Sequence, residues 1–456
     1  MLLPEIKFHS KTSSSYYIAL AAWRRGLAVT FIKNSNNFRI TSSEKSLFFC
    51  NSAMISGAQG IVAHNSCKNK FLTKQLLAKN EVSVPIGKLF TERQTDEEII
   101  AYAQTLVFPV VVKPNNESNG QDVYANIGSL SELKKVLALF RKKRINFELI
   151  LEEHKKGFDN RVYVVGDRVV AAYRRTPANI IGDGTHCVND LIKICNESRS
   201  HNPHLHSRPI IVDEEVLWRL EKDGYSLNTI IPKYKKIYLR SKANLTAGGD
   251  LEDMTESLPS QICELAVSAC KAIPNLNNAG IDILFCEKEN PHGSVIEINS
   301  MAQLPGHIYP TIGKSRDIAS EIIDFFFPES KISSNRNGDF FFNMVQVDRI
   351  LNAFEQYEYT LSPSSVNQTI KMQFFIMKSK INEQQKMKIR DEARRLNLSG
   401  FNCAEDDGER IVIRGESLDV DVFIKFLKKL LNDGSFLTTS SSYDLPITYG
   451  YYNQIN

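Results

Sequence analysis

The sequence lacks a cysteine framework and a long apolar run. None of its eight cysteines forms a C-x-x-C pair, which disfavours a disulfide scaffold or a zinc site and suits free thiols. The longest early apolar stretch, "YYIALAAW", ends at Arg24 and Arg25 and is too short to span a bilayer. The opening "MLLPEIKFHSK" has no apolar signal-peptide core. We therefore expect a cytoplasmic protein with no membrane partner.

A strong net charge is also absent. The formal charge of +4 over 456 residues argues neither for nor against nucleic acid. No domain-wide basic face with interleaved aromatic residues appears, and we expect no nucleic-acid partner. The apolar content of 42% and the charged content of 24% are ordinary for a globular protein. The length leaves room for about three domains.

Two polar stretches divide the chain. "KISSNRNGD" and "LSPSSVNQ" predict a linker, and the apolar segment that they bracket could be a strand or a short helix. Strands and helices alternate before this linker, and a compact β-α-β-β-α pattern follows it. The fold class expected is α/β and α+β. The predicted order is a small α/β region, a large domain, the linker, a second domain and a tail, at residues 1–65, 66–330, 331–365, 366–436 and 437–456.

One predicted hairpin carries three oxygen donors. "AGIDILFCEKENPHGSVIEINS" (Ala279–Ser300) predicts two strands joined by a polar turn. Because side chains alternate along a strand, Glu297 and Asn299 share a face, and Asp282 lies on the neighbouring strand. Close carboxylates repel each other unless a cation such as Mg²⁺ lies between them. The alternative is that the two acids lie on an edge strand and face water.

Two other segments are polar where a ligand could bind. "FPVVVKPNNESNGQDVYANI" places Lys113 at the end of a strand, before a polar loop. Such a lysine can reach a phosphate, and a solvated strand end is the alternative. "HNPHLH" resembles a set of metal ligands, but it lies in a polar, proline-containing stretch, and we interpret it as a solvated loop.

An ordered set of motifs resembles the ATP-grasp superfamily of carboxylate–amine ligases, and most of all the branch of cyanophycin synthetase and bifunctional glutathione synthetase. The resemblance covers about residues 60–328. The motifs are "NKFLTKQLLAKNEVSVP", "VVVKP", "LILEEHKKGFDNRVYVV", "RRTPANIIGDG", "YLRSKANLTAGG", "AGIDIL", "VIEINS" and "IYPTIGK". The resemblance implies an ATP-grasp fold, preceded by a short α/β region. It also implies an enzyme that makes C–N bonds through an acyl phosphate and releases ADP and phosphate.

The resemblance assigns roles to particular residues. It implies ATP as cofactor with two Mg²⁺ ions, Mn²⁺ being the alternative metal, and a small-molecule carboxylate and amine as substrates. The implied metal ligands are Asp282, Glu297 and Asn299. The implied nucleotide contacts are Lys70, Lys113, Gly120, Glu152 and Asp159, with Glu152 at the hinge beside adenine and Asp159 at the ribose. The implied catalytic residues are Arg161, Arg174, Arg175, Arg240 and Asn244.

Several points stay open at this stage. Each of the four arginines has pairing with a structural carboxylate as its alternative role. The loop "ESNGQD" has Glu117 and Asp122 where the family has glycines, and only Gly120 remains. No downstream GKT or GKS phosphate loop follows, so the second domain of cyanophycin synthetase is expected to be missing. A weakly active or inactive ATP-binding regulatory protein is therefore the alternative function, and homo-oligomer formation is left open.

The C-terminal region resembles a second family. The stretch from "FIMKSKINEQQK" to "VDVFIKFLKKL" is similar to acylphosphatase, which implies a ferredoxin-like domain. The resemblance places Lys386 at the position of the family's phosphate-binding arginine and Ala404 at that of its water-positioning asparagine. The phosphate loop also becomes "KINEQQK", which has no glycine. We therefore expect a domain without hydrolase activity.

Overall fold

The structure is a computed structural model that describes most of the chain. The described residues are 13–117, 122–143, 147–286, 292–333, 340–342, 344–353, 357–361, 370–377, 381–396, 398–405, 408–431, 436–439, 447–448 and 451–453. Two compact units are present. Of the described residues, the first unit contains those in 15–46 and from 326 onward, and the second contains those in 13–14 and 47–325.

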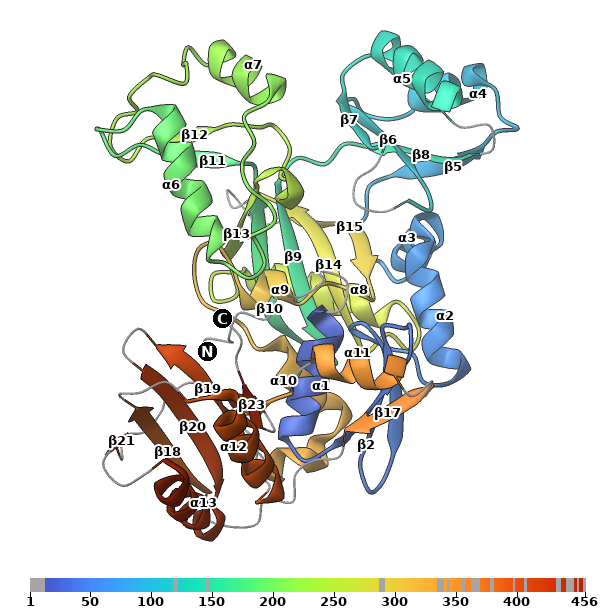
Figure 1. Ribbon diagram of the computed structural model, residues 1–456. Coiled ribbons are helices and arrows are strands. Elements are labelled where there is room, and N and C mark those ends of the chain that lie inside the picture. The colour runs from blue at the N-terminus through green and yellow to red at the C-terminus, as the bar shows by residue number, and fades with distance from the viewer. Residues whose placement is uncertain are drawn as a thin grey trace. The chain divides into compact units, whose positions relative to one another are not determined.

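A large five-stranded sheet forms the centre of the second unit (Figure 1). In order across the sheet, its strands are β13 (Asp250–Asp253), β10 (Arg168–Thr176), β9 (Phe158–Val165), β14 (Asn278–Phe285) and β15 (Ser294–Asn299). The pairs are antiparallel. Since β9 and β14 alternate, Val162, Val164, Ile281 and Ile283 share one buried face. Helix α8 (Ser260–Lys271) packs against this face.

A four-stranded antiparallel sheet forms a second layer of this unit, at the upper right of Figure 1. Its order is β5 (Gly87–Thr91), β8 (Glu148–Glu153), β6 (Val110–Pro114) and β7 (Tyr124–Ile127). Helices α4 (Asp96–Ala103) and α5 (Leu130–Lys143) contribute Ile99, Leu133 and Leu137 to a core with this sheet. A capping box between Thr95 and Glu98 starts α4.

The remaining elements of the second unit complete the frame around the large sheet. Helices α2 (Gly57–Lys68) and α3 (Lys70–Lys79) precede β5, and both contact β15. An excursion after β10 has a core of its own and contains β11 (Asn179–Ile181), α6 (Val188–Ser200), α7 (Glu214–Lys222) and β12 (Lys236–Tyr238). The other elements are β3 (Ser46–Cys50), β4 (Ala53–Met54), η1 (Leu245–Ala247), α9 (Pro305–Ile308) and α10 (Ile318–Phe326). No helix in the described ranges combines the length and the apolar character needed to cross a bilayer.

The first unit draws on both ends of the chain. Helix α1 (Ser13–Arg24) and strands β1 (Ala28–Ile32) and β2 (Asn37–Thr41) come from the N-terminal part. The predicted linker begins within η2 (Pro328–Ser333) and contains β16 (Phe340–Phe341), α11 (Met344–Ala353) and β17 (Glu358–Leu361). Strand β17 pairs antiparallel with β1, and Thr30 Oγ1 lies 2.9 Å from Thr360 Oγ1. The linker over 331–365 stays a prediction, and its apolar segment contains β17, whose pairing with β1 local sequence cannot reveal.

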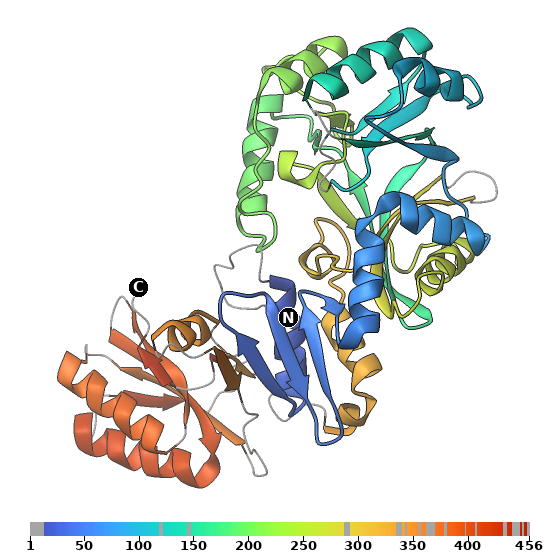
Figure 2. The ribbon, with the colours of Figure 1, turned by 90° about the vertical axis from the view of Figure 1, so that its right-hand side faces the viewer.

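The C-terminal part of this unit has the element order that the sequence predicts. The order is β18 (Ile370–Met377), α12 (Glu383–Arg395), β19 (Ser399–Glu405), β20 (Gly408–Glu416), α13 (Ser417–Leu431) and β21 (Phe436–Thr439). The sheet order is β21-β18-β20-β19-β23, and the two helices are drawn on one side of it in Figure 2. The predicted tail contributes β22 (Ile447–Thr448) and β23 (Tyr451–Asn453), and β23 pairs parallel with β19. The likeness to acylphosphatase stays a prediction.

Candidate functional site

The face of the large sheet opposite α8 is charged. Asp282 on β14 lies directly opposite Glu297 on β15 and opposite Arg161 on β9. Asn299 follows two residues after Glu297, and its Nδ2 lies 3.5 Å from Asp282 Oδ2. The structure thus contains the predicted hairpin and brings its three oxygen donors to one face, as strand alternation predicts. Their role as metal ligands stays a prediction.

Two arginines hold the Asp282 carboxylate. Arg161 Nη2 donates to Asp282 Oδ2 at 2.9 Å, and Arg175 Nη2 lies 3.2 Å from Asp282 Oδ1. Arg175 Nη1 also donates to both oxygens of Asp159 at 2.9 Å. Burial opposes ionisation of Asp282, but the charges of Arg161 and then Arg175 prevail and lower its pKa to about 2. Burial raises the pKa of Asp159, with Arg175 opposing.

The three oxygen donors suit a hard divalent cation that binds both protein oxygens and phosphate oxygens. Mg²⁺ takes carboxylate, amide and phosphate oxygens, and Asp282, Glu297 and Asn299 provide the first two types on one face. Within the described ranges, no group of three His, Cys, Asp or Glu side chains converges to hold a metal. An ion at this face would therefore complete its shell with oxygens from a ligand or from water.

Lys70 links the start of α3 to this face. Its Nζ lies 3.1 Å from Glu297 Oε1 and also donates to the backbone oxygen of Glu117. Asn69 caps the helix by accepting from Leu72 N at 2.9 Å, which places Lys70 at the first helical position. Gly120 lies outside the described residues. Asp122, beyond it, ion-pairs with Lys143 at 2.8 Å, so that this carboxylate is matched by a lysine of α5.

Lys113 and Glu152 form a buried ion pair in the four-stranded sheet. Lys113 Nζ lies 2.7 Å from Glu152 Oε1, and both side chains are almost fully buried. A second lysine, Lys74 from α3, pairs with Glu152 Oε2. Sequence reasoning missed Lys74. The one signal that could have found it is its position four residues after Lys70, which puts both lysines on one side of α3.

Three of the predicted catalytic residues lie elsewhere in the structure. Arg174 precedes Arg175 and so faces the other side of β10, where its Nε donates to Asn160 Oδ1 at 3.4 Å. Arg240 ion-pairs with Asp213 and Glu215, each at 2.7 Å, which is the structural pairing left open for each arginine. Asn244 caps η1: its Oδ1 accepts from Thr246 N at 3.0 Å.

His307 is another residue that sequence reasoning missed. It is 2% exposed, and its ring lies 4.3 Å from the ring of Tyr173 at a tilt of 46° and edge-on to Tyr163 at 5.7 Å. Tyr173 is two residues from Arg175, and Tyr163 is two residues from Arg161. Because residues two apart in a strand share a face, both tyrosines lie on the charged face. Burial, followed by the charges of Arg161 and Arg175, holds the pKa of His307 well below its usual value. The imidazole beside the charged face is therefore neutral at physiological pH.

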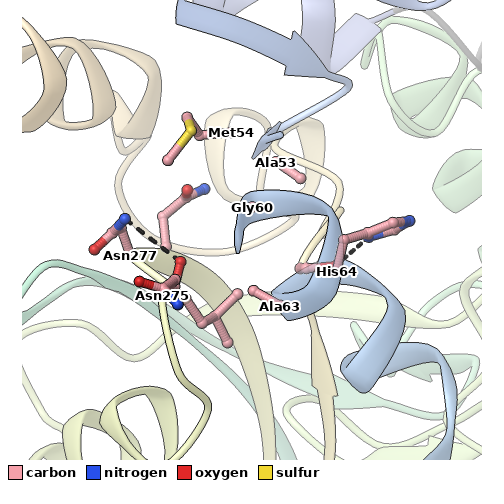
Figure 3. Close-up of a pocket in the computed structure, with 10 residues that line it drawn as sticks. Ala53, Met54, Gly60, Ala63, His64, Asn275 and Asn277 are labelled. Carbon is pink, nitrogen blue, oxygen red and sulfur yellow. Dashed lines mark hydrogen bonds between the residues drawn. The ribbon is translucent and has the colours of Figure 1, made fainter. Parts of the chain in front are cut away.

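A small pocket lies apart from the residues of the charged face. Its labelled lining residues come from β4, α2 and the turn before β14 (Figure 3). His64 Nδ1 lies 2.7 Å from Ser300 Oγ there. The volume of about 10 Å³ is room for about one water molecule. This pocket cannot hold a nucleotide, and the charged face remains the candidate site.

Residues 67–183 match the family model described as a RimK-like ATP-grasp domain. This part of the chain is therefore similar to RimK-like ATP-grasp domains. The matched range contains the buried pair of Lys113 and Glu152. It also contains Lys70 and the charged residues of β9 and β10, which are Asp159, Arg161 and Arg175. The β14–β15 hairpin lies beyond it.

Curated relatives and a solved structure are similar over a longer part of the chain than the family model. A cyanophycin synthetase of Crocosphaera subtropica is 32% identical over 285 residues, which are 60% of this chain and 32% of the relative. A glutathione biosynthesis bifunctional protein of Pasteurella multocida is 28% identical over 274 residues, which are 58% of this chain and 35% of the relative. The crystal structure of a bifunctional glutathione synthetase from Pasteurella multocida aligns with a TM-score of 0.52 and 25% identity, covering 66% of this chain and 41% of that one. The chain thus spans about a third of the length of these two curated relatives.

Proposed function

We propose that the chain is an ATP-dependent carboxylate–amine ligase. The observation that carries the proposal is the charged face of the ATP-grasp domain, where oxygen donors from β14 and β15 adjoin two arginines and a lysine. A carboxylate substrate would attack the γ-phosphorus of ATP and release ADP. An amine would then attack the carbonyl carbon of the acyl phosphate, lose a proton and release phosphate. The proposed substrates are small carboxylates and amines of the amino-acid or peptide class, and the proposed location is the cytoplasm.

The lysines and the hairpin would bind the nucleotide and its metal. In the proposed roles, Lys70 and Lys113 contact phosphates, while Asp282, Glu297 and Asn299 hold two Mg²⁺ ions, with Mn²⁺ as the alternative. When bound, the metal offsets the negative charge that develops during phosphoryl transfer. Lys70 already lies 3.1 Å from Glu297, so that one positive group of the protein adjoins the proposed metal ligands.

Arg161 and Arg175 suit the acyl-transfer step. A guanidinium remains charged and can bind a carboxylate or a phosphate through two parallel hydrogen bonds. Arg161 already binds Asp282 in this way, through Nε and Nη2. A cation bound by Asp282 would compete for the same oxygens and direct these arginines toward a substrate carboxylate or the acyl phosphate. Arg174, Arg240 and Asn244 stay predicted catalytic residues, but the argument from the charged face does not depend on them.

A nucleotide-binding regulatory protein is the second candidate. The observation in its favour is that Lys70, Lys113, Arg161 and Arg175 all pair with carboxylates of the same chain. In addition, Glu117 and Asp122 stand where the resembling family has glycines. A chain of this kind would bind ATP without turnover.

The C-terminal domain is proposed to lack hydrolase activity. Lys386 Nζ lies 3.1 Å from Glu383 Oε1 and 3.3 Å from Glu409 Oε1. Glu409 is 2% exposed, and its other oxygen accepts from Asn402 Nδ2 at 3.0 Å. The lysine at the proposed phosphate position is thus paired with carboxylates of its own domain, where a phosphate would be repelled.

Release of ADP tests the proposed ligase. The full chain with ATP and Mg²⁺ is screened against pairs from an amino-acid panel, and amide products are identified by mass spectrometry. We expect ADP formation that depends on both a carboxylate and an amine, and its loss when EDTA removes the metal. Tight ATP binding with no ADP released for any pair would favour the regulatory protein. Absence of ATP binding would contradict both candidates.

A further inference from the structure

The structure buries more positive than negative charge at one point. The side chains of Lys74, Lys113 and Glu152 are 9%, 5% and 3% exposed. One carboxylate serves two ammonium groups, with Glu152 Oε1 on Lys113 and Oε2 on Lys74. A buried charge is costly unless it is paired. The excess of one positive charge therefore points to an anion as a further partner.

The three residues come from different parts of the second unit. Lys113 lies on β6 and Glu152 lies on its paired strand β8. Leu149 and Leu151 of β8 belong to the core of the four-stranded sheet. Lys74 comes from α3, whose Leu77 belongs to the core under the large sheet. Lys74 therefore connects the helix beside the large sheet to the four-stranded sheet. Figure 1 draws α3 below β5 and β8, at this junction.

We propose that Lys74 is a positioning residue of the nucleotide site: it holds one oxygen of Glu152 and so keeps Lys113 available to a phosphate. This inference rests on the proposed function, in which Lys113 contacts ATP. With Lys74 charged, Glu152 divides its two oxygens between two lysines. Without that charge, both oxygens turn to Lys113, which then binds Glu152 at the expense of the phosphate.

The protonation state of Lys74 agrees with this role. Burial, followed by the charge of Lys113, lowers the pKa of Lys74 to about 7, although Glu152 opposes the shift. The charged groups that face it are Glu152 from β8 and Lys113 from β6, while Lys70 and its partner Glu297 lie one helical turn away. Lys74 is charged below this pKa and neutral above it. ATP affinity should therefore fall as the pH rises through about 7.

Calorimetry of ATP binding to the full chain tests the proposal. Lys74→Met should weaken ATP binding about tenfold at pH 6, because a charge-assisted contact to Glu152 is lost. Lys74→Arg keeps the charge and should stay within about threefold of the wild type. It should also lose the pH step, because arginine does not titrate in this range. Lys79→Met removes an exposed lysine of the same helix and should change nothing.

A double-mutant cycle separates positioning from a general effect on the fold. If Lys74 acts through Glu152, then Lys74→Met should change affinity less than about twofold in the Glu152→Gln background. Equal weakening in both backgrounds, or wild-type affinity in Lys74→Met, would overturn the proposal. If Lys74→Met does not fold, Lys74→Arg decides, since persistence of the pH step in that variant also overturns it.

The same titrations keep this inference distinct from the proposed function. A wild type that binds ATP but releases no ADP removes the ligase and leaves the role of Lys74 to be decided by the cycle. A wild type that does not bind ATP at any pH removes both. The ionisation of ATP itself is common to all variants, so that only differences between variants are interpreted.

Discussion

The large sheet and the C-terminal sheet both carry a buried carboxylate that is matched by basic side chains, but they use it differently. Asp282 is held by Arg161 and Arg175, and beside it lie Glu297 and Asn299, which are only partly buried. Glu409 is held by Lys386, by Asn402 and by the backbone N–H of Ile381 at 3.3 Å. The first carboxylate belongs to a row of oxygen donors on one sheet face.

The difference lies in which partners a ligand can replace. Glu297 is 29% exposed and Lys70 is 12% exposed, so water and ions can reach this edge of the charged face. Glu409 is 2% exposed, and its carboxylate oxygens are bound by Lys386, Asn402 and the backbone N–H of Ile381. A buried carboxylate with satisfied acceptors stabilises a fold. A carboxylate that adjoins further oxygen donors at an accessible edge can change partners when a cation arrives.

The largest expected effect is the loss of ADP formation when Glu297, at the accessible edge of the charged face, is substituted. Glu297→Gln keeps the size of the side chain and removes one charge from the proposed metal site. We expect ADP formation to fall at least about a hundredfold, since a bound metal contributes several kcal/mol to such steps. The measurement is ADP release at saturating Mg²⁺ with Asp167→Asn, an exposed acid on the β9–β10 turn, as control. Turnover near that of the wild type would remove Glu297 from the metal site.

Asp282→Asn should reduce stability as well as activity. The substitution leaves Arg161 and Arg175 without their shared carboxylate, and breaking a buried pair costs about 3–5 kcal/mol. Urea unfolding of the full chain, compared with Asp167→Asn, measures this loss. A change below about 1 kcal/mol would show that the arginines re-pair with Asp159 or with water.

Acid should remove the contribution of Asp282 in a defined range. Its folded pKa of about 2 lies below the unfolded value of about 3.9, so that ionisation favours the folded state. The stabilisation is complete above about pH 4 and is lost as the pH falls through about 2. Acid unfolding of the wild type and of Asp282→Asn should therefore converge in stability between these values. Curves that stay parallel through the range would contradict the ion pairing.

The smallest expected effect is on the C-terminal side. The full chain should hydrolyse benzoyl phosphate no faster than buffer, because Lys386 is paired with Glu383 and Glu409. Lys386→Met should leave that background rate unchanged. Hydrolysis well above the buffer rate that disappears in Lys386→Met would show that Lys386 takes part in hydrolysis. The proposal that this domain lacks hydrolase activity would then be wrong.

Strand alternation accounts for most of what could be predicted at the candidate site. Asp282, Glu297 and Asn299 are close in sequence to one turn, and a period of two places them on one face wherever the hairpin lies. The partners of these residues could not be predicted in the same way. Arg161 is more than a hundred residues before Asp282, and their contact depends on the register of β9 against β14. The partners of Arg174 and Arg240 show the same limit, since Asn160, Asp213 and Glu215 could not be read from the motifs that carry these arginines.

The sequence by itself determined the order of the C-terminal elements, the hairpin with its oxygen donors, and the likeness to ATP-grasp ligases, because each depends on short-range periodicity or on contiguous motifs. Only the tertiary structure decided that β17 pairs with β1, that Asp282 is held by two arginines, and that Lys74 joins Lys113 at Glu152. These contacts join segments far apart in the chain. Their physical basis is pairing of backbone edges and of buried charges, which forms only after the chain has folded.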